Sequence, residues 1–396
     1  MSWQSVKLGQ IFEIARGGSP RPIDDFITEE PDGLNWISIK DASNSGKYIS
    51  KTKLKIRKEG LSKSRLVHPG DFLLTNSMSF GRPYIVNTTG CIHDGWLVLS
   101  GDKNKVNQDY FYHLLGSDLL HKKFSSLAAG AVVKNLNINL VKNVEVPLPP
   151  LTEQQKIAAI LDAADSLRQK DQELVERYTA LSQSLFLEMF GDPVTNPMGW
   201  SYTQLNNLVS KLGDGLHGTP EYSDDGEYFF INGNNLNHGA IEFFPETKKV
   251  SKAEFDKHKK NLNDSTILVS INGSIGKVAF YNGEKIILEK SACYFNTNEK
   301  LINKIYLFRL IESPYFLKYA MGGATGSTIK NVSLKTMREL PVPMPPINMQ
   351  NQFAERAQLI EAQKQQAQRS LEKSEALFNS LLQRAFTGEL TAKMAA

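Results

Sequence analysis

The stretch VPLPPLTEQQKIAAIL occupies residues 146–161 and marks an abrupt change in the character of the sequence. Before it, short runs of β-branched and aromatic residues alternate with turn-forming residues, a pattern typical of β-strands. After it, apolar residues recur every three or four positions, a pattern typical of a helix. Because proline is unfavourable inside a helix but readily precedes one, this stretch is the boundary between a β-rich module and a long helix.

The same boundary occurs a second time. VPMPPI at 342–347 repeats VPLPPL at 146–151, a shift of 196 residues. Two further pairs recur at nearly the same spacing: GAVVKNL at 130–136 with GSTIKNV at 326–332, and GSP at 18–20 with GTP at 218–220. A repeat of this length is a duplicated domain rather than a solenoid. The chain therefore has the order module, helix, module, helix.

The repeat predicts four segments, since 396 residues exceed the usual size of one domain. These are a first module over 1–147, a helical region over 148–191, a second module over 192–343 and a helical region over 344–396. Each module combines strand-like runs with helical patterns, at 109–120 in the first copy and 304–321 in the second. We expect an α+β fold, with two pseudo-repeated α/β modules that each contain a curved β-sheet.

The long helices carry end signals and a candidate packing seam. Thr152 and Gln155 have the spacing of a capping box, and Gly191 and Gly388 suit the position after a helix end. Each helix should span about 57 Å at 1.5 Å per residue, which is typical of a spacer. We expect an antiparallel coiled coil, whose seam on the first helix consists of Ile157, Ile160, Ala164, Leu167, Leu174, Tyr178, Leu181 and Leu185.

Basic residues gather in the modules and not in the helices. The net charge is +4, whereas 152–190 carries a net charge of −3 and 348–390 is neutral. Lysine and arginine concentrate at 51–65 and again at 248–260, before the same predicted strand of each copy. A single lysine run is usually solvated surface, but its recurrence favours a surface that faces a polyanion.

Polar residues after that strand could contact DNA bases, because Arg and Lys donate to guanine and Asn pairs with adenine. The alternative is that Asn76 and Asn272 only stabilise turns. The predicted DNA-binding residues are Lys53, Lys55, Arg57, Asn76, Ser77, Arg82, Lys134 and Asn135 in the first module, and Lys249, Lys257, Lys259, Asn272, Ser274, Lys277, Lys330 and Asn331 in the second.

The sequence lacks the usual signatures of an enzyme. It contains no P-loop, no HExxH, no nucleophile elbow and no dinucleotide-binding fingerprint. The seven histidines show no metal-ligand spacing, so we assign no catalytic residue and no metal site. Two cysteines without a CxxC partner suit a reducing compartment. No run of eighteen apolar residues occurs, and we expect a cytoplasmic protein with no membrane partner.

Over essentially its whole length the chain resembles the specificity subunit of type I restriction-modification systems. The resemblance rests on the repeat architecture, on PLPPLTEQQKI at 147–157, which is similar to the family's entry into its first conserved helix, and on AFTGEL at 385–390, which is similar to the family's usual ending. The second copy reads INMQN at 347–351 and lacks the Glu-Gln pair of the first.

The resemblance implies a non-catalytic subunit whose modules are target recognition domains, each reading one half of a bipartite site in double-stranded DNA. It also implies two methyltransferase subunits as partners and, through them, restriction subunits. S-adenosylmethionine, ATP and magnesium are expected on those partners, and no cofactor on this chain. The residues also allow another function, a structural or protein-interaction adaptor built from a duplicated β-module; such an adaptor would show no salt-dependent affinity for DNA.

Overall fold

The computed structural model describes residues 3–76, 81–129, 136–322 and 331–392, and these form two compact units. The first unit comprises residues 1–173 and 368–396, and the second comprises 174–367. Each unit contains one predicted module together with part of both long helices, α6 (Leu151–Phe190) and α11 (Ile347–Thr387). We describe each unit by itself.

The first unit is built on two five-stranded sheets. One has the order β2-β11-β8-β9-β5 and the other β3-β6-β4-β10-β7, while β1 pairs with β12. The strands are β1 (Ser5–Lys7), β2 (Phe12–Arg16), β3 (Ile27–Thr28), β4 (Leu34–Ile37), β5 (Tyr48–Ile49), β6 (Leu54–Ile56), β7 (Arg65–Val67), β8 (Phe72–Thr75), β9 (Pro83–Val86), β10 (Gly90–Ile92), β11 (Trp96–Gly101) and β12 (Glu145–Pro147). Its helices are α1 (Leu8–Ile11), α2 (Ile39–Ser43), α3 (Gln108–Leu115), α4 (Asp118–Ala129), α5 (Ile138–Lys142) and α12 (Glu389–Ala392).

The second unit repeats this plan with fewer strands. Its main sheet has the order β14-β22-β19-β20, beside a sheet β18-β15-β21 and the pairs β13-β23 and β16-β17. The strands are β13 (Tyr202–Gln204), β14 (Val209–Gly213), β15 (Tyr228–Ile231), β16 (Leu236–Asn237), β17 (Ala240–Ile241), β18 (Lys249–Val250), β19 (Thr266–Ser270), β20 (Val278–Phe280), β21 (Ile286–Leu288), β22 (Ala292–Thr297) and β23 (Pro341–Pro343). Its helices are α7 (Lys252–His258), α8 (Lys304–Glu312), α9 (Pro314–Gly322) and α10 (Leu334–Arg338).

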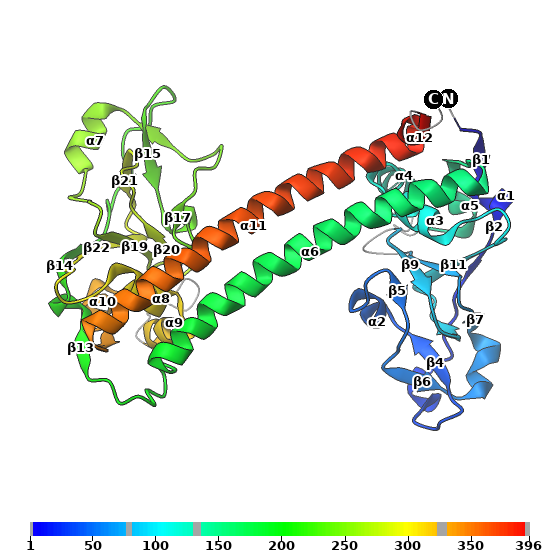
Figure 1. Cartoon of the computed structure of the whole chain (residues 1–396), viewed down its shortest axis with the longest axis horizontal. Coiled ribbons are helices and arrows are strands. Elements are labelled where there is room, and N and C mark those ends of the chain that lie inside the picture. Colours follow the sequence, from blue (N-terminus) through cyan, green and yellow to red (C-terminus); the bar gives the residue numbers. More distant parts are fainter. Residues whose placement is uncertain (1–2, 77–80, 130–135, 323–330, 393–396) are drawn as a thin grey trace. The chain divides into compact units, whose positions relative to one another are not determined.

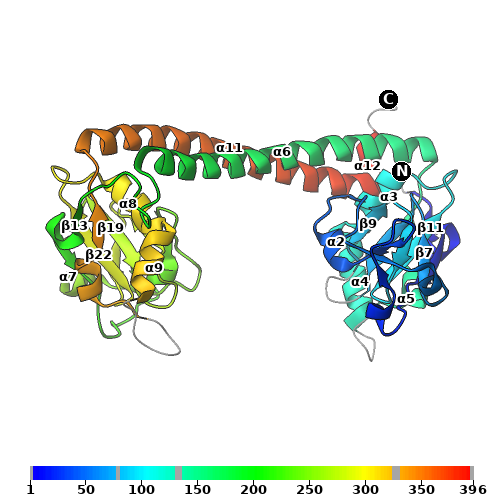
Figure 2. The same cartoon turned by 90° about the horizontal axis from the view of Figure 1, so that it is seen from below.

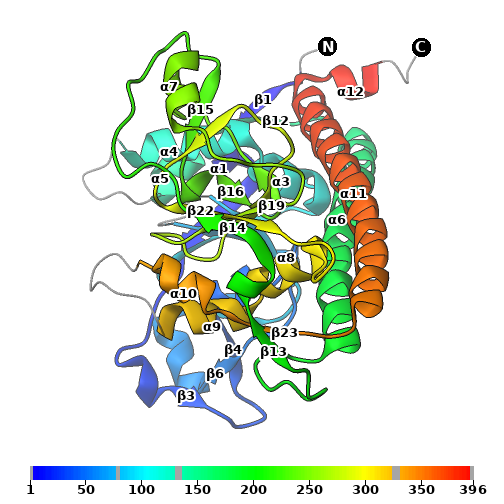
Figure 3. The ribbon, with the colours of Figure 1, turned by 90° about the vertical axis from the view of Figure 1, so that its left-hand side faces the viewer.

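In each unit a short helix separates the main sheet from the long helices: α3 in the first unit and α8 in the second (Figure 2). The first turns of α6 share a hydrophobic core with the last turns of α11 through Ile157 and Ala385. In the second unit the end of α6 shares a core with the start of α11 through Phe190 and Phe353. Within each unit the two helices are therefore antiparallel, and they lie side by side there (Figures 1 and 3). This confirms the predicted α+β fold with an antiparallel helix pair.

The predicted C-terminal signals of the long helices are correct, but the predicted N-terminal cap is wrong. Gly191 and Gly388 follow α6 and α11 with φ of +75° and +84°, the left-handed conformation that glycine favours. At the other end, α6 begins at Leu151, so Thr152 lies inside the helix. The backbone N–H of Gln154 donates instead to the backbone carbonyl of Pro150, the residue just before the helix.

A buried glutamine replaces the capping box in both copies. In the first unit the backbone N–H of Asn107, just before α3, donates to Oε1 of Gln154 at 2.8 Å, and the Gln154 side-chain amide donates to the Pro149 carbonyl at 2.9 Å. Gln350 makes the same bonds to the Asn303 N–H, at 2.9 Å, and the Pro345 carbonyl, at 2.8 Å. Gln154 and Gln350 lie 196 residues apart, so the second copy keeps the glutamine that connects the long helix to its module.

The predicted seam of α6 is also wrong in part. Leu167, Leu174 and Leu181 are 46%, 41% and 49% exposed. The buried stripe instead continues from Ile157 through Leu161, Ala164, Ser182 and Phe186. Half-buried Asp171 belongs to this stripe and accepts a hydrogen bond at 3.2 Å from the Ser370 hydroxyl of α11. The contact surface between the helices is therefore partly polar, and the heptad leucines face away from it.

A charged network joins the first module to α6. The Lys47 ammonium lies 2.6 Å from a carboxylate oxygen of Asp109 on α3 and 2.8 Å from one of Asp162 on α6. Buried His113 contacts the same Asp162 oxygen through Nε2 at 2.7 Å. Burial alone raises the pKa of Asp162, but hydrogen bonds from Lys47 and His113 outweigh burial and lower it. Burial lowers the pKa of His113, so its neutral ring donates through Nε2–H.

This network should make the stability of the first unit depend on pH. The folded pKa of His113 lies below the unfolded value of about 6.5, so the unfolded chain binds the proton more readily, and stability falls as the pH drops below about 6.5. We expect the thermal midpoint of wild type to fall between pH 7.5 and 5.5, and that of His113→Gln, which keeps a donor but does not titrate, to fall less. Equal shifts in both proteins would contradict this role.

Candidate nucleic-acid interface

The basic cluster of the first module lies on the surface around β6 and the turn that follows it. Lys53 and Arg57 are exposed, whereas half-buried Lys55 donates from Nζ to the carbonyl of Pro31 at 3.1 Å. Nearby, the Lys58 ammonium lies 2.7 Å from the Asp32 carboxylate, and both side chains are exposed to solvent. Within this cluster, the predicted cations Lys53 and Arg57 are thus more accessible to a phosphate than Lys55.

The basic cluster of the second module is partly neutralised by its own helix. Lys257 of α7 lies 3.3 Å from Glu254, and Lys259 lies 2.9 Å from Asp256. The hydrogen bond from Lys259 lowers the pKa of Asp256. Both ammonium groups are exposed, and ion pairs of surface lysines are weak, so both lysines could exchange a carboxylate for a phosphate. Lys249 instead lies 5.5 Å from the centroid of the Phe229 ring.

The predicted polar loop of the first module divides into residues with different surroundings. Asn76 is buried, and its side-chain amide donates to the Asp94 carbonyl at 2.7 Å. These contacts favour the turn-stabilising alternative for Asn76, and its role as a base-reading residue stays a prediction. Arg82 is exposed, with its guanidinium 5.3 Å from the centroid of the Tyr84 ring. Ser77, Lys134, Asn135 and Lys330 lie outside the described residues.

The corresponding loop of the second module lies between β19 and β20. Gly273 and Gly276 have φ of +72° and +88°, as the sharp turn requires. The backbone of Asn272 forms an isolated β-bridge with Asn331. Ser274 is exposed and donates from its hydroxyl to Oδ1 of Asn234 at 3.4 Å. The bond to Asn234 places this loop beside a polar cleft that the sequence prediction missed.

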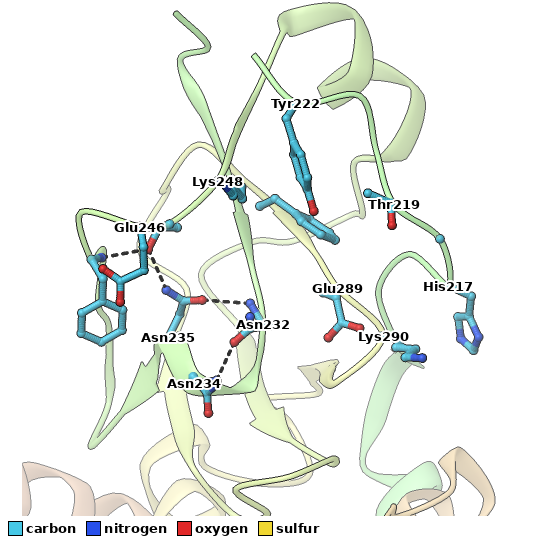
Figure 4. A pocket seen from close by; sticks show the side chains of 14 residues that line it. His217, Thr219, Tyr222, Asn232, Asn234, Asn235, Glu246, Lys248, Glu289 and Lys290 are labelled. Carbon is cyan, nitrogen blue, oxygen red and sulfur yellow. Dashed lines mark hydrogen bonds between the residues drawn. The ribbon is translucent and has the colours of Figure 1, made fainter. Parts of the chain in front are cut away.

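That cleft opens at the carboxyl edge of a parallel strand pair (Figure 4). Its volume is about 460 Å³. β15 and β21 run parallel with Ile231 opposite Leu288, so the residues that follow them, Asn232 and Glu289, emerge at the same edge. The side chains around it are mostly polar or aromatic: His217, Thr219, Tyr222, Asn232, Asn234, Lys248, Glu289 and Lys290.

Local bonds hold the floor of the cleft while its rim stays accessible. Oδ1 of Asn232 accepts from the Asn234 N–H at 2.9 Å, and buried Asn235 donates to the Thr247 hydroxyl at 3.2 Å (Figure 4). Asn234 and Lys290 are exposed at the rim. The exposed amide and ammonium are groups that can bond to base edges.

The GTP motif at 218–220 begins beside this edge, and the GSP motif at 18–20 has the same place in the first unit. There β4 and β10 also run parallel, with Ile37 opposite Ile92. A Cβ on Gly17 would collide with the carbonyl of His93, and one on Gly215 would collide with the carbonyl of Leu288. Glycine therefore allows the segment to pass close to the strand end in both copies.

The side chains on this shared frame differ between the units. In the first unit Asp94 accepts from the Ser19 hydroxyl at 2.8 Å and pairs with the exposed guanidinium of Arg21 at 3.4 Å. The Ser19 hydrogen bond is the main cause that lowers the pKa of Asp94. The second unit has Glu289 and Lys290 there, with His217 opposite. The two modules thus present different donors and acceptors from one backbone frame. The GSP and GTP repeat was the sequence signal that could have located this edge.

No described helix is long and apolar enough to cross a membrane. Across residues 3–76, 81–129, 136–322 and 331–392, His, Cys, Asp and Glu side chains form no group of three or more that could hold a metal ion.

Comparison with known proteins supports the architecture. The crystal structure of the type I restriction-modification system S subunit from M. genitalium matches with a TM-score of 0.60 at 16% identity, over 98% of this chain and 96% of that one. A second, from a study of complex assembly in the type I R-M system, has a TM-score of 0.57 at 17% identity, over 98% of both chains. At these identities the likeness shows the fold alone.

Curated relatives match along the same length. The specificity subunit of the type I restriction enzyme EcoKI from Escherichia coli K12 is 24% identical over 99% of this chain and 90% of its own length. That of EcoBI, also from Escherichia coli, is 22% identical over 99% of this chain and 87% of its own length. The family model described as "Type I restriction modification DNA specificity domain" matches twice, at residues 1–177 and 197–372. The chain therefore belongs to the type I restriction-modification DNA specificity family.

Proposed function

We propose that this chain is the specificity subunit of a type I restriction-modification complex and that each module reads one half of a bipartite site in double-stranded DNA. The observation that carries the proposal is the duplicated strand edge, which has one backbone frame but different polar groups in each copy. Two domains that read different DNA sequences need the same backbone frame and different side chains, because the backbone frame positions the polar side chains and those side chains contact the bases.

The proposal includes partners and a division of chemistry. The chain acts in the cytoplasm without catalysing a reaction and docks two methyltransferase subunits, which bind S-adenosylmethionine. Restriction subunits with ATP and magnesium join through the methyltransferase subunits. An adaptor without DNA affinity is the competing function, and titration against duplex DNA at several salt concentrations separates the two, because phosphate contacts make binding salt-dependent.

Exchange of one module tests the proposal. Residues 3–147 would be replaced by the equivalent segment of a relative with a different known target, and methylated DNA from cells with the whole system would be sequenced. We expect one half of the methylated site to change and the other half to persist, because the second module is untouched. A change in both halves would show that the modules are not independent readers.

A further inference from the structure

We infer that two equivalent turn residues select bases of opposite chemistry in the two half-sites: His93 donates to guanine, and Glu289 accepts from cytosine. This assignment rests on the proposed function and extends it, because it names the base that one side chain of each module prefers. His93 follows β10 and Glu289 follows β21, the strands that belong to the two parallel pairs described above. The two residues lie 196 positions apart, which is the period of the repeat.

The backbone of the turn is the same in both units. The carbonyl of His93 accepts from the N–H of Trp96 at 3.1 Å, and the carbonyl of Glu289 accepts from the N–H of Ala292 at 2.9 Å. Each bond joins the first residue of the turn to the residue three positions later. The two side chains therefore start from equivalent backbone positions and differ in their chemistry.

The side chain of His93 closes its turn with one ring nitrogen. Nδ1 accepts from the N–H of Gly95 at 2.9 Å, and the half-buried ring lies 6.0 Å from the Trp96 ring between centroids. Burial lowers the pKa of His93 and outweighs the opposing charge of Asp94, so the ring is neutral at pH 7. A neutral ring whose Nδ1 accepts carries its proton on Nε2. Among the described residues this N–H has no acceptor, so it remains available to a ligand.

The side chain of Glu289 closes its turn with one carboxylate oxygen. Oε2 accepts from the N–H of Ser291 at 2.9 Å and also from the Ser291 hydroxyl. That hydroxyl accepts from the N–H of Gly233 at 3.0 Å, which holds the hydroxyl in place. Oε1 has no donor within the described part of the chain, and Glu289 lines the polar cleft at the strand edge (Figure 4). The second unit therefore leaves an acceptor at the position where the first leaves a donor.

These two groups suit different bases in the major groove of DNA. Guanine presents two acceptors there, N7 and O6, whereas cytosine presents the donor N4–H₂. The Nε2–H of His93 therefore suits guanine. A carboxylate beside guanine or thymine would face acceptors, and beside adenine it would face N7 next to the amino group. The carboxylate of Glu289 therefore suits cytosine.

Neighbouring cations agree with both assignments. Lys290 follows Glu289 and is exposed at the same cleft. In a C·G pair the guanine acceptors lie beside the cytosine amino group, so the carboxylate and the ammonium can contact both bases of one pair. In the first unit the exposed guanidinium of Arg21 lies 3.4 Å from Asp94, the residue after His93, and it adds another donor that suits guanine.

Glutamine at position 289 tests the choice of cytosine, because it keeps an oxygen for the turn but replaces the second oxygen with an amide donor. Wild type, Glu289→Gln and Glu289→Ala would be assembled with the methyltransferase subunits of the same system. Each complex would be titrated against cognate duplexes in which every base pair of both half-sites is changed in turn. Glu227→Gln is the matched control, since it removes the same charge from an exposed side chain of this module outside the cleft. Circular dichroism checks that every variant is folded.

We expect wild type and Glu227→Gln to prefer a C·G pair at one position of the second half-site. Glu289→Gln and Glu289→Ala should both reduce that preference by about 10- to 100-fold and leave the first half-site unchanged. A folded Glu289→Gln that keeps every base preference would show that Glu289 only closes its turn, and would overturn the inference. A preference lost at a pair other than C·G would overturn the choice of cytosine.

The same substitution should have the opposite result in the first module. His93→Ala should reduce the preference for guanine at one position of the first half-site by a similar factor. His93→Gln should recover most of it, because glutamine can accept from Gly95 with its oxygen and donate with its amide. No recovery in a folded His93→Gln would overturn the donor role of His93. In each of these cases the proposed function stands, whereas a wild-type complex that binds all duplexes alike would overturn it as well.

Discussion

Replacing Phe353 with alanine should lower the free energy of unfolding of the second unit by about 3–5 kcal/mol. Phe353 is fully buried near the start of α11. Its ring lies 5.6 Å from that of Phe186 and 5.2 Å from that of Phe190, both at the end of α6 and both at steep edge angles. Truncation of Phe353 to alanine removes a buried aromatic ring and leaves a cavity between the two helices.

Urea denaturation measures the loss in the free energy of unfolding, and hydrogen exchange of the backbone amides in 174–367 assigns that loss to the second unit. Leu359→Ala is the control on the same helix, because that exposed side chain should change stability by no more than about 0.5 kcal/mol. Phe353→Leu should lose less than Phe353→Ala, since it keeps most of the buried volume. A loss below about 1 kcal/mol for Phe353→Ala would mean that this aromatic cluster does not hold the helix pair together.

The sequence predicted the ends of the long helices better than their contacts. Gly191 and Gly388 are local signals, since the left-handed conformation after a helix depends on one residue. The choice of buried face depends on what lies opposite. Leu167, Leu174 and Leu181 offered a regular apolar row that only Asp171 interrupts, yet the other helix and the module pack against a stripe that contains Asp171 and Ser182. Apolar spacing could not reveal this, because hydrogen bonds make the polar positions acceptable in the seam.

At the candidate interface, too, the sequence predicted local features better than contacts between distant residues. Basic residues were found correctly as surface clusters, because lysine is rarely buried. The cleft could not be found, because parallel pairing brings Asn232 next to Glu289 across 57 residues of sequence. The surroundings of Asn76 could not be predicted for a related reason, since its partner Asp94 belongs to a strand connection that only the folded sheet brings near. Long-range strand pairing, not residue type, decides which polar groups meet.

The groups at this interface should separate into those that fix position and those that choose the sequence. Lys53 is an exposed, flexible point charge, so Lys53→Ala should weaken binding to all duplexes alike and lower the salt slope by about one. Lys259→Ala should have a smaller effect, because its ammonium must first leave Asp256. Neither lysine lines the strand-edge cleft.

Asn234→Ala and Lys290→Ala should instead cost about 1–3 kcal/mol on the cognate duplex and relax the choice of one base pair in the half-site of the second module. Both side chains are exposed at the rim of a cleft whose floor is fixed by Asn232 and Asn235, so their loss removes donors and leaves the floor in place, although Asn234→Ala also removes the acceptor of the Ser274 hydroxyl. Titration of each variant against cognate and scrambled duplexes at several salt concentrations, with the methyltransferase subunits present, measures both quantities. Equal losses on both duplexes would assign Asn234 and Lys290 to the phosphate backbone and leave base reading to the neighbouring loop at Ser274 and Lys277.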